Sequence, residues 1–431
     1  MNYTVKEVLQ FVESNDVKFV RLVFFDIFGV KKNISIMSSE LKNVFRNGAL
    51  VSSANVCGFE GRDSSDLLLF PDPTTLRVLT WRPQQGAVVR LLCDIRHQNG
   101  TPFEADVRMV LKNAVEKIRK SGFSCTVGLA CEFYLFKMDD DGNPTHIPHD
   151  NAGYLDVAPL DKGENVRRNI CLTLEDMDII PLSSHHENGP GQNEIDFKHS
   201  DLLSAADDYS TFKSVVKAAA SMSGLYASFM PKPIIDKSGS GMHINVVLKE
   251  YDENIFTDKG YGMNKKAKSF IAGILRRAAE MTLFFNPLSN SYTRFGSYEA
   301  PSGIDWSYGN INTLVRVLMP ETDRARVDYR SPDPSCNPYL CFALLVYAGL
   351  EGIEDGLDLC EANEQGNTTV ERLPQSLADA IELARKSEFI KKHIPKRIFD
   401  NFINLKTEEM KRSIESAEYK KAQDERYFEI I

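Results

Sequence analysis

The sequence predicts an α+β protein in two parts, a small β-rich N-terminal domain of residues 1–105 and a larger mixed domain of residues 106–431. Residues 20–30 and 88–95 are rich in β-branched and aromatic side chains, which is typical of strands. The turn Asn-Gly-Thr-Pro at residues 99–102 then precedes a change to helical periodicity. A chain of 431 residues has room for two or three domains, and we place the boundary just after this turn.

Strands and helices are mixed in the larger part, without a repeat of fixed period. Apolar residues recur at three- and four-residue spacing from Val107 to Ile118, which predicts a helix ending at Gly122. Further helices are predicted at residues 165–178, 206–224, 264–285, 338–355, 375–387 and 408–427. Strands are predicted at residues 130–137, 193–198, 242–248, 314–318 and 326–330.

Composition narrows the classes of partner. The chain has 51 Lys and Arg against 60 Asp and Glu, a net charge of −9, which argues against nucleic-acid binding. The longest apolar stretch, residues 339–350, is far shorter than the roughly 20 residues that span a bilayer, so no membrane partner is expected. The N-terminus has no secretory pattern and the eight cysteines form no CxxC pair, so we expect reduced thiols and a cytoplasmic protein.

The densest polar segment is HHENGPGQNE, residues 185–194. Its Gly-Pro-Gly centre excludes a helix, which leaves a strand–turn–strand or a loop. Either geometry could bring Glu187 and Glu194 to one point, where carboxylate oxygens suit a hard cation such as Mg²⁺ or Mn²⁺. The alternative is a solvated polar loop without a ligand.

A second acidic residue, Glu132, lies inside an apolar strand. By the two-residue period it shares a face with Tyr134 and Phe136. A carboxylate on a buried face is costly unless it is paired or bound to a metal. Alternatively, Glu132 stands at the end of the sheet and reaches water.

Two further segments are candidates for ligand contact. The sequence SGSGMH, residues 238–243, is a glycine-rich turn before a strand, where the backbone could approach a ligand closely. It is also consistent with a plain tight turn and a core histidine at His243. In residues 326–334, alternation puts Arg326, Asp328 and Arg330 on one face, which suits either an anionic ligand or a structural ion-pair ladder.

Taken in order, Glu132, HHENGPGQNE, SGSGMH, NSYTR with YEAP (residues 290–301) and RVDYRSPDPSCNPYL (residues 326–340) resemble the glutamine synthetase family over nearly the whole chain. The resemblance implies an N-terminal β-grasp domain and a catalytic α/β domain with an antiparallel curved sheet. It also implies a homo-oligomer, a hexamer or dodecamer with active sites between subunits. The implied reaction joins the γ-carboxylate of glutamate to ammonia or an amine through a γ-glutamyl phosphate, with ATP as co-substrate and Mg²⁺ or Mn²⁺ as cofactor.

The resemblance also assigns roles to individual positions. The carboxylates of one metal site match Glu132, Glu187 and Glu194, and the second site retains His243 and Asp328. The positions that match glutamate binding are Ser238, Gly239, His243, Arg294 and Arg330. The positions that match contacts to nucleotide or phosphate are Asn245, Arg316 and Arg326. Glu299 matches the flap acid that helps to deprotonate the amine, and Arg294 and Arg316 match residues that act in catalysis with it.

Several positions depart from the family pattern. Ala130 stands where the second metal site has a glutamate, and Asp328 is one methylene shorter than the usual ligand. Ile311 replaces an arginine, Ser238 replaces an asparagine and Asn245 replaces a histidine. The flap from Arg294 to Glu299 is one residue shorter.

The departure with the clearest consequence lies in the N-terminal domain. Ser52 aligns with the aspartate that attracts ammonium, and a neutral hydroxyl cannot concentrate a cation. Glu60 and Asp63 are the alternatives that could supply this charge. Three hypotheses follow: a ligase whose acceptor is an amine other than ammonia, an ordinary glutamine synthetase, and a catalytically impaired sensor or assembly paralogue.

Overall fold

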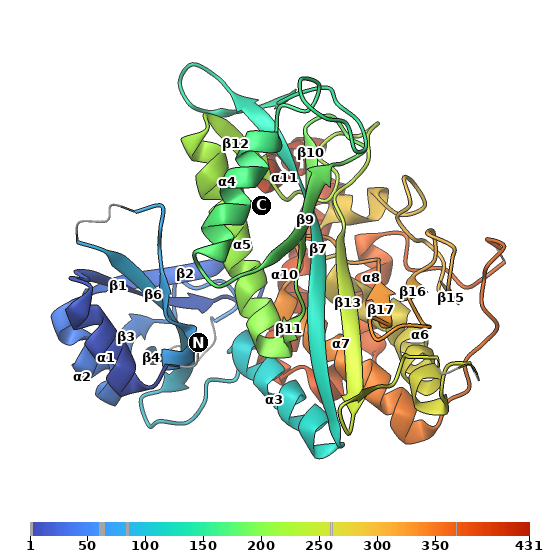
Figure 1. The fold of residues 1–431 in the computed structure, drawn as a ribbon, viewed down its shortest axis with the longest axis horizontal. Helices are drawn as coiled ribbons and strands as arrows, with labels where there is room; N and C mark the ends of the chain where they lie inside the picture. The colour runs from blue at the N-terminus through green and yellow to red at the C-terminus, as the bar shows by residue number, and fades with distance from the viewer. Residues whose placement is uncertain (1–2, 60–64, 83–85, 259, 261, 368) are drawn as a thin grey trace.

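The computed structural model describes residues 3–59, 65–82, 86–258, 260, 262–367 and 369–431. It has two sheets, with the N-terminal sheet on one side of the larger one (Figure 1). The predicted α+β class is confirmed, and the division at residue 105 stays a prediction. None of the described helices has the length and apolar character needed to cross a bilayer.

The N-terminal sheet has the strand order β2-β1-β6-β4-β3, with β5 beside β6. Its elements are α1 Val5–Ser14, β1 Phe19–Phe25, β2 Lys31–Met37, η1 Ser38–Glu40, α2 Leu41–Asn47, β3 Ala49–Ser52, β4 Asp66–Pro71, η2 Pro73–Thr75, β5 Arg77–Val78 and β6 Val88–His97. The strand predicted for residues 20–30 ends early, at Phe25. The Asp26 carboxylate accepts hydrogen bonds from the backbone N–H groups of Phe28 and Val30, which reverses the chain into β2.

The larger sheet has the order β15-β16-β17-β13-β7-β10-β9, and four short strands pair with β7 or β13. Its strands are β7 Phe123–Met138, β8 Pro144–Pro148, β9 Pro181–His186, β10 Gln192–Phe197, β11 Ser200–Asp201, β12 Leu225–Ser228, β13 Met242–Glu250, β14 Glu253–Asn254, β15 Trp306–Ser307, β16 Val315–Leu318 and β17 Arg326–Tyr329. Every described pairing in it is antiparallel except β15 with β16. The five strands predicted in this part are therefore confirmed, with β7 extending further towards the N-terminus.

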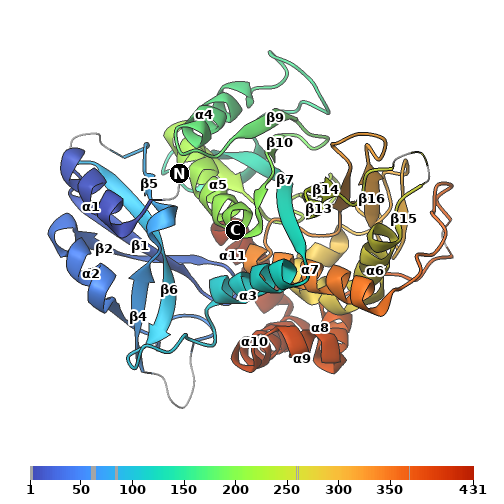
Figure 2. The same cartoon turned by 60° about the horizontal axis from the view of Figure 1, so that its bottom comes forward.

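The helices of the larger part are α3 Val107–Lys120, α4 Glu164–Glu175, α5 Leu202–Met222, α6 Lys265–Phe285, α7 Pro338–Asp355, α8 Leu377–Lys386, α9 Glu388–His393, α10 Lys396–Glu415 and α11 Ala417–Ile430, with η3 at Ser289–Thr293. Figure 2 shows α8, α9 and α10 grouped on the side away from the β9–β10 hairpin. The single helix predicted for residues 408–427 is wrong. Ser416 is extended and its hydroxyl accepts a hydrogen bond from the Tyr419 N–H, so it caps a new helix, α11.

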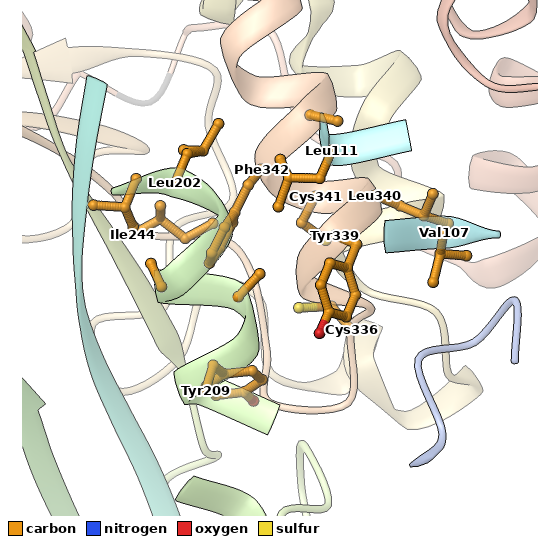
Figure 3. Packing of buried hydrophobic residues seen from close by; sticks show 14 of the residues in the cluster. Val107, Leu111, Leu202, Tyr209, Ile244, Cys336, Tyr339, Leu340, Cys341 and Phe342 are labelled. Carbon is orange, nitrogen blue, oxygen red and sulfur yellow. The ribbon is translucent and has the colours of Figure 1, made fainter. Parts of the chain in front are cut away.

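The core is organised around α7, which is apolar on almost all sides because it is covered by other elements. Figure 3 shows its residues Leu340 and Phe342 among side chains from α3, α5 and β13. Helix α6 crosses α7 closely where two glycines meet. A Cβ on Gly273 would lie 2.2 Å from the Ala348 carbonyl oxygen, so no side chain fits there. This core covers the face of β7 and β13 that carries Leu129, Cys131 and Ile244. The other face of the two strands carries Glu132 and His243.

Candidate active site

A row of polar side chains crosses the sheet from β9 to β7. Glu194 on β10 lies directly opposite Glu132 on one neighbour and opposite His185 on the other. Directly opposed residues of antiparallel strands project to the same face, with Cβ atoms roughly 5 Å apart. Residues 185–194 therefore form the strand–turn–strand that was one of the two predicted alternatives, and Glu187 lies at the start of its turn, where its N–H donates to the Gln192 carbonyl over 2.9 Å.

The three glutamates repel one another in a poorly solvated place. Burial, together with the Glu187 charge, raises the pKa of Glu132 to about 8. Burial and the charge of Glu132 raise the pKa of Glu194 well above its usual range. Among the described residues, no lysine or arginine lies within ion-pair distance of Glu187 or Glu194. A divalent cation would supply the missing positive charge, so the donor set fits Mg²⁺ or Mn²⁺.

Gln192, which the sequence reasoning missed, joins the acidic row to the glycine-rich turn. Its buried side-chain amide donates to Glu132 Oε2 over 2.9 Å and to the Gly239 carbonyl over 3.1 Å. The Gly241 N–H donates to the same Glu132 oxygen over 3.0 Å. The Ser238 hydroxyl in turn donates to the Gln192 amide oxygen. The turn of residues 238–243 is thus held against Glu132 rather than standing apart as a simple connection.

Gly239 has no room for a side chain in this turn. A Cβ there would lie 2.5 Å from the Pro231 carbonyl oxygen and 2.6 Å from Arg294 Cγ. Because the first obstacle is backbone, alanine has to displace the turn itself.

We expect Gly239→Ala to raise the KM for glutamate and to lower kcat/KM by about 10²-fold, because a displacement of about 1 Å at a substrate site has effects of that size. Steady-state kinetics with varied glutamate check this, and circular dichroism should show a wild-type fold. Gly153→Ala is the matched control, since Gly153 has no positive φ and a Cβ there makes only an ordinary contact, 3.6 Å from an Asp156 carboxylate oxygen. Equal kinetics for Gly239→Ala and the wild type would contradict the expectation.

A second group of charged residues lies two strands away on the same face. Asp328 on β17 is opposite Asn245 on β13 and Arg316 on β16. Arg330 Nη1 donates to Asp328 Oδ2 over 3.2 Å, while the buried Oδ1 has no hydrogen-bond partner among the described residues. Burial raises the pKa of Asp328, and Arg330 opposes this rise. The free oxygen is consistent with a role as a ligand.

His243 stands between the two groups. Burial lowers the pKa of His243 well below its usual range, and Arg330 and Arg294 add to this effect. The imidazole is therefore neutral, the form that coordinates metals. The strand register places His243 directly opposite Ala130, and the alanine side chain has no atom that could bind a metal. The candidate ligands of the second metal site are therefore His243 and Asp328.

Three further predicted site residues, Arg326, Asn245 and Arg294, make hydrogen bonds to other parts of the chain. Arg326 Nε donates to Asn245 Oδ1 over 3.2 Å, so the structure brings these two phosphate candidates together. Arg294 is buried and donates to the carbonyls of Ser331 over 3.0 Å and Pro332 over 3.2 Å, behind the glycine-rich turn. These hydrogen bonds from the Arg294 guanidinium to backbone carbonyls were not predicted from the sequence.

Glu299, which the resemblance predicts to be the flap acid, is exposed. Both it and Tyr298 have positive φ angles, 67° and 48°, and the Tyr298 hydroxyl donates to the Asp236 carbonyl over 2.9 Å. A cavity of about 350 Å³ beside the flap is lined by Glu299 and by asparagine side chains. Ile311, which the sequence resemblance places at an arginine position, is 40% exposed.

The predicted contribution of the N-terminal domain stays a prediction. Ser52 is exposed at the end of β3, in the sheet that Figure 1 shows to one side of β9 and β10. Among the described residues, β3 does not lie over the strands β7, β9 and β10 of the same chain, which position Glu132, Glu187 and Glu194. Glu60 and Asp63, the alternatives to Ser52, lie outside the described residues.

Comparison with known families matches both parts of the chain. Residues 16–98 match the family described as "Glutamine synthetase, beta-Grasp domain", and residues 104–424 match "Glutamine synthetase, catalytic domain". Among curated proteins, the chain is 42% identical over 420 residues to a glutamine synthetase of Clostridium saccharobutylicum, covering 94% of this chain and 95% of that protein. It is 41% identical to a glutamine synthetase of Methanosarcina mazei, covering 94% and 93%.

Solved structures agree on the fold. A complex of GmaS with ADP has a TM-score of 0.86 and 26% identity, and the match covers 96% of this chain and 97% of that one. A Plasmodium falciparum glutamine synthetase also has a TM-score of 0.86, covering 96% and 97%, and at 20% identity it bears on the fold alone. The β-grasp and catalytic-domain architecture implied by the sequence is thereby confirmed.

Proposed function

Because this chain belongs to the glutamine synthetase family, we propose that it is an ATP-dependent ligase that joins the γ-carboxylate of glutamate to ammonia or an amine. One observation carries this proposal. Glu132, Glu187 and Glu194 converge on one face of the sheet, beside a group of arginines and a neutral histidine. Such an arrangement suits the transfer of a phosphoryl group, which needs charge neutralisation more than covalent chemistry.

Each group has a place in this reaction. Glu132, Glu187 and Glu194 would hold one divalent cation, and His243 with Asp328 would hold another. When bound, such cations would supply positive charge against the phosphates, where the glutamate γ-carboxylate attacks the γ-phosphorus of ATP and ADP leaves. Arg316, Arg326 and Asn245 would orient the phosphates, while Ser238, Gly239, Arg294 and Arg330 would place glutamate. The amine nitrogen then attacks the acyl carbon of γ-glutamyl phosphate, phosphate leaves, and Glu299 accepts the proton.

The positions that differ from the family pattern bear mainly on which amine is the acceptor. Ser52 in place of an aspartate removes the charge that would attract ammonium, which favours an amine other than ammonia. Relatives named glutamine synthetase at 40–42% identity favour ammonia, so ordinary glutamine synthetase is the second candidate. We further propose a homo-oligomer, a hexamer or dodecamer, in which a neighbouring N-terminal domain completes each site, and a cytoplasmic location.

A single assay tests the function and the acceptor together. ADP release is measured with glutamate plus ammonia or a series of primary amines, with Mg²⁺ and again with Mn²⁺. We expect ADP release that depends on glutamate, and a higher kcat/KM with at least one amine than with ammonia. A higher value with ammonia would establish the second candidate. ADP release that is absent with every acceptor, or independent of glutamate, would exclude both.

A further inference from the structure

His185 lies among the carboxylates, although the family match assigns it no role as a ligand. One donor atom each from His185, Glu187 and Glu194 lies within 4.8 Å of the other two. His185 Nε2 is 2.9 Å from Glu187 Oε1, and the strand register places His185 directly opposite Glu194. These three residues thus face one point from both strands of a single hairpin.

The ring of His185 is held in this orientation. Tyr154 packs against it edge to face, with ring centroids 5.6 Å apart and planes at 88°. The His185 side chain is 21% exposed and that of Glu187 is 11% exposed, so the pair is largely withdrawn from water. A fixed, half-buried nitrogen beside two carboxylates offers a coordination site at little cost in conformational entropy.

Glu132 has only one free oxygen, and Glu187 Oε2 is likewise occupied, by hydrogen bonds from the Asn188 N–H and side-chain amide. Glu132 Oε2 accepts two hydrogen bonds, from the Gln192 amide and from the Gly241 N–H, so Oε1 alone remains for a cation. A centre built from Glu132, Glu187 and Glu194 therefore lacks one donor that a second Glu132 oxygen could have supplied. His185 Nε2 is the atom placed to fill that position.

We propose that His185 is a nitrogen ligand of the centre formed with Glu187 and Glu194, and that it makes this centre prefer Mn²⁺ over Mg²⁺. Imidazole suits transition metals, whereas Mg²⁺ requires oxygen ligands and retains its water. The inference rests on the proposed function only in that a divalent cation binds at these carboxylates. A simple hydrogen bond between His185 and Glu187 is the alternative.

The adjacent residue His186 does not compete for this role. Its Nε2 is 2.9 Å from the Asp150 carboxylate and its Nδ1 is 2.7 Å from the Glu187 carbonyl oxygen. Both partners are acceptors, so both ring nitrogens carry hydrogens and neither is free for a metal. His243 also lies on this face, and the His199 ring lies over the same face at Gly128, so the experiment has to distinguish His185 from both.

The test is pulsed electron paramagnetic resonance of the full-length protein with less than one Mn²⁺ per chain, without ATP or glutamate. We expect a ¹⁴N coupling to Mn²⁺ in the wild type and in His243→Gln, and its loss in His185→Gln. Mn²⁺ titrations should show an affinity at least about tenfold lower in His185→Gln, because even the loss of an outer partner of a ligand costs 10–100-fold. Competition with Mg²⁺ should show a smaller loss for Mg²⁺.

A coupling that persists in His185→Gln, or that disappears in His243→Gln, would overturn the assignment. Equal losses of affinity for Mn²⁺ and Mg²⁺ would overturn the proposed preference. If His185→Gln does not fold, a coupling that persists in both His243→Gln and His199→Gln keeps the test decisive. Since no substrate is present, a protein with the coupling but without ligase activity would refute the proposed function and leave this inference standing.

Discussion

Arg108→Leu should lower the free energy of unfolding by about 3–5 kcal/mol, the range found when one partner of a buried ion pair is removed. Arg108 lies on α3 and its side chain is 1% exposed. Its guanidinium contacts Asp72 and Asp94 of the N-terminal part, each over 3.0 Å, and Asp207 on α5 over 2.8 Å. Without it, three carboxylates between the two sheets lose their shared positive charge.

The expected loss of stability is large because few other groups can neutralise the carboxylates that Arg108 pairs with. Asp207 is 6% exposed, and among the described residues its remaining side-chain hydrogen bond comes from a neutral donor, the Tyr339 hydroxyl at 2.7 Å. Arg90 and Lys31 act on it only through their charge. Lys112 still pairs with Asp94, so the loss falls mainly on Asp207 and on the junction between the sheets. Urea unfolding followed by circular dichroism measures the change.

Arg119→Leu is the matched control, because Arg119 lies on the same helix and pairs with Glu116 at the exposed surface. It should leave the urea midpoint close to that of the wild type. If Arg108→Leu unfolds at the same urea concentration as Arg119→Leu, the network does not hold the two parts together.

Arg316→Gln should lower kcat by about 10²–10³-fold, the typical cost of removing one donor aimed at developing charge. Arg316 lies opposite Asp328, on the face that carries the other proposed phosphate contacts. Its buried Nε has no hydrogen-bond partner among the described residues, so the guanidinium is not committed to a structural contact. Since it is proposed to contact phosphate rather than glutamate, the KM for glutamate should change little.

The measurement is steady-state ADP release with varied glutamate at saturating ATP. Arg324→Gln provides the control, because Arg324 is an exposed arginine in the turn between β16 and β17. It should keep the wild-type kcat. A large rise in the KM for glutamate with unchanged kcat in Arg316→Gln would show that Arg316 binds substrate instead.

Local patterns predicted the elements on which the site is built. The Gly-Pro-Gly centre of residues 185–194 excluded a helix because those residues disfavour it wherever they occur, which left a strand–turn–strand or a loop for the structure to decide. Helix 338–355 is confirmed to the residue, and the structure shows a proline at its start and a glycine in the left-handed conformation at its end. The break at Ser416 was missed because a serine in a continuous helical pattern is equally compatible with a helix interior and with a cap.

The residues proposed for the candidate site could be named from the sequence, since Glu132, Glu187, Glu194 and Arg330 lie in short motifs whose order is typical of one family. The tertiary structure decided which of these side chains meet. Strand register placed His185 opposite Glu194 and left His243 facing Ala130, and one buried amide, Gln192, tied Glu132 to the glycine-rich turn. Arg108 joins acids separated by about a hundred residues. Pairing between strands and buried charge networks depend on contacts between distant segments, and periodicity within one segment carries no information about them.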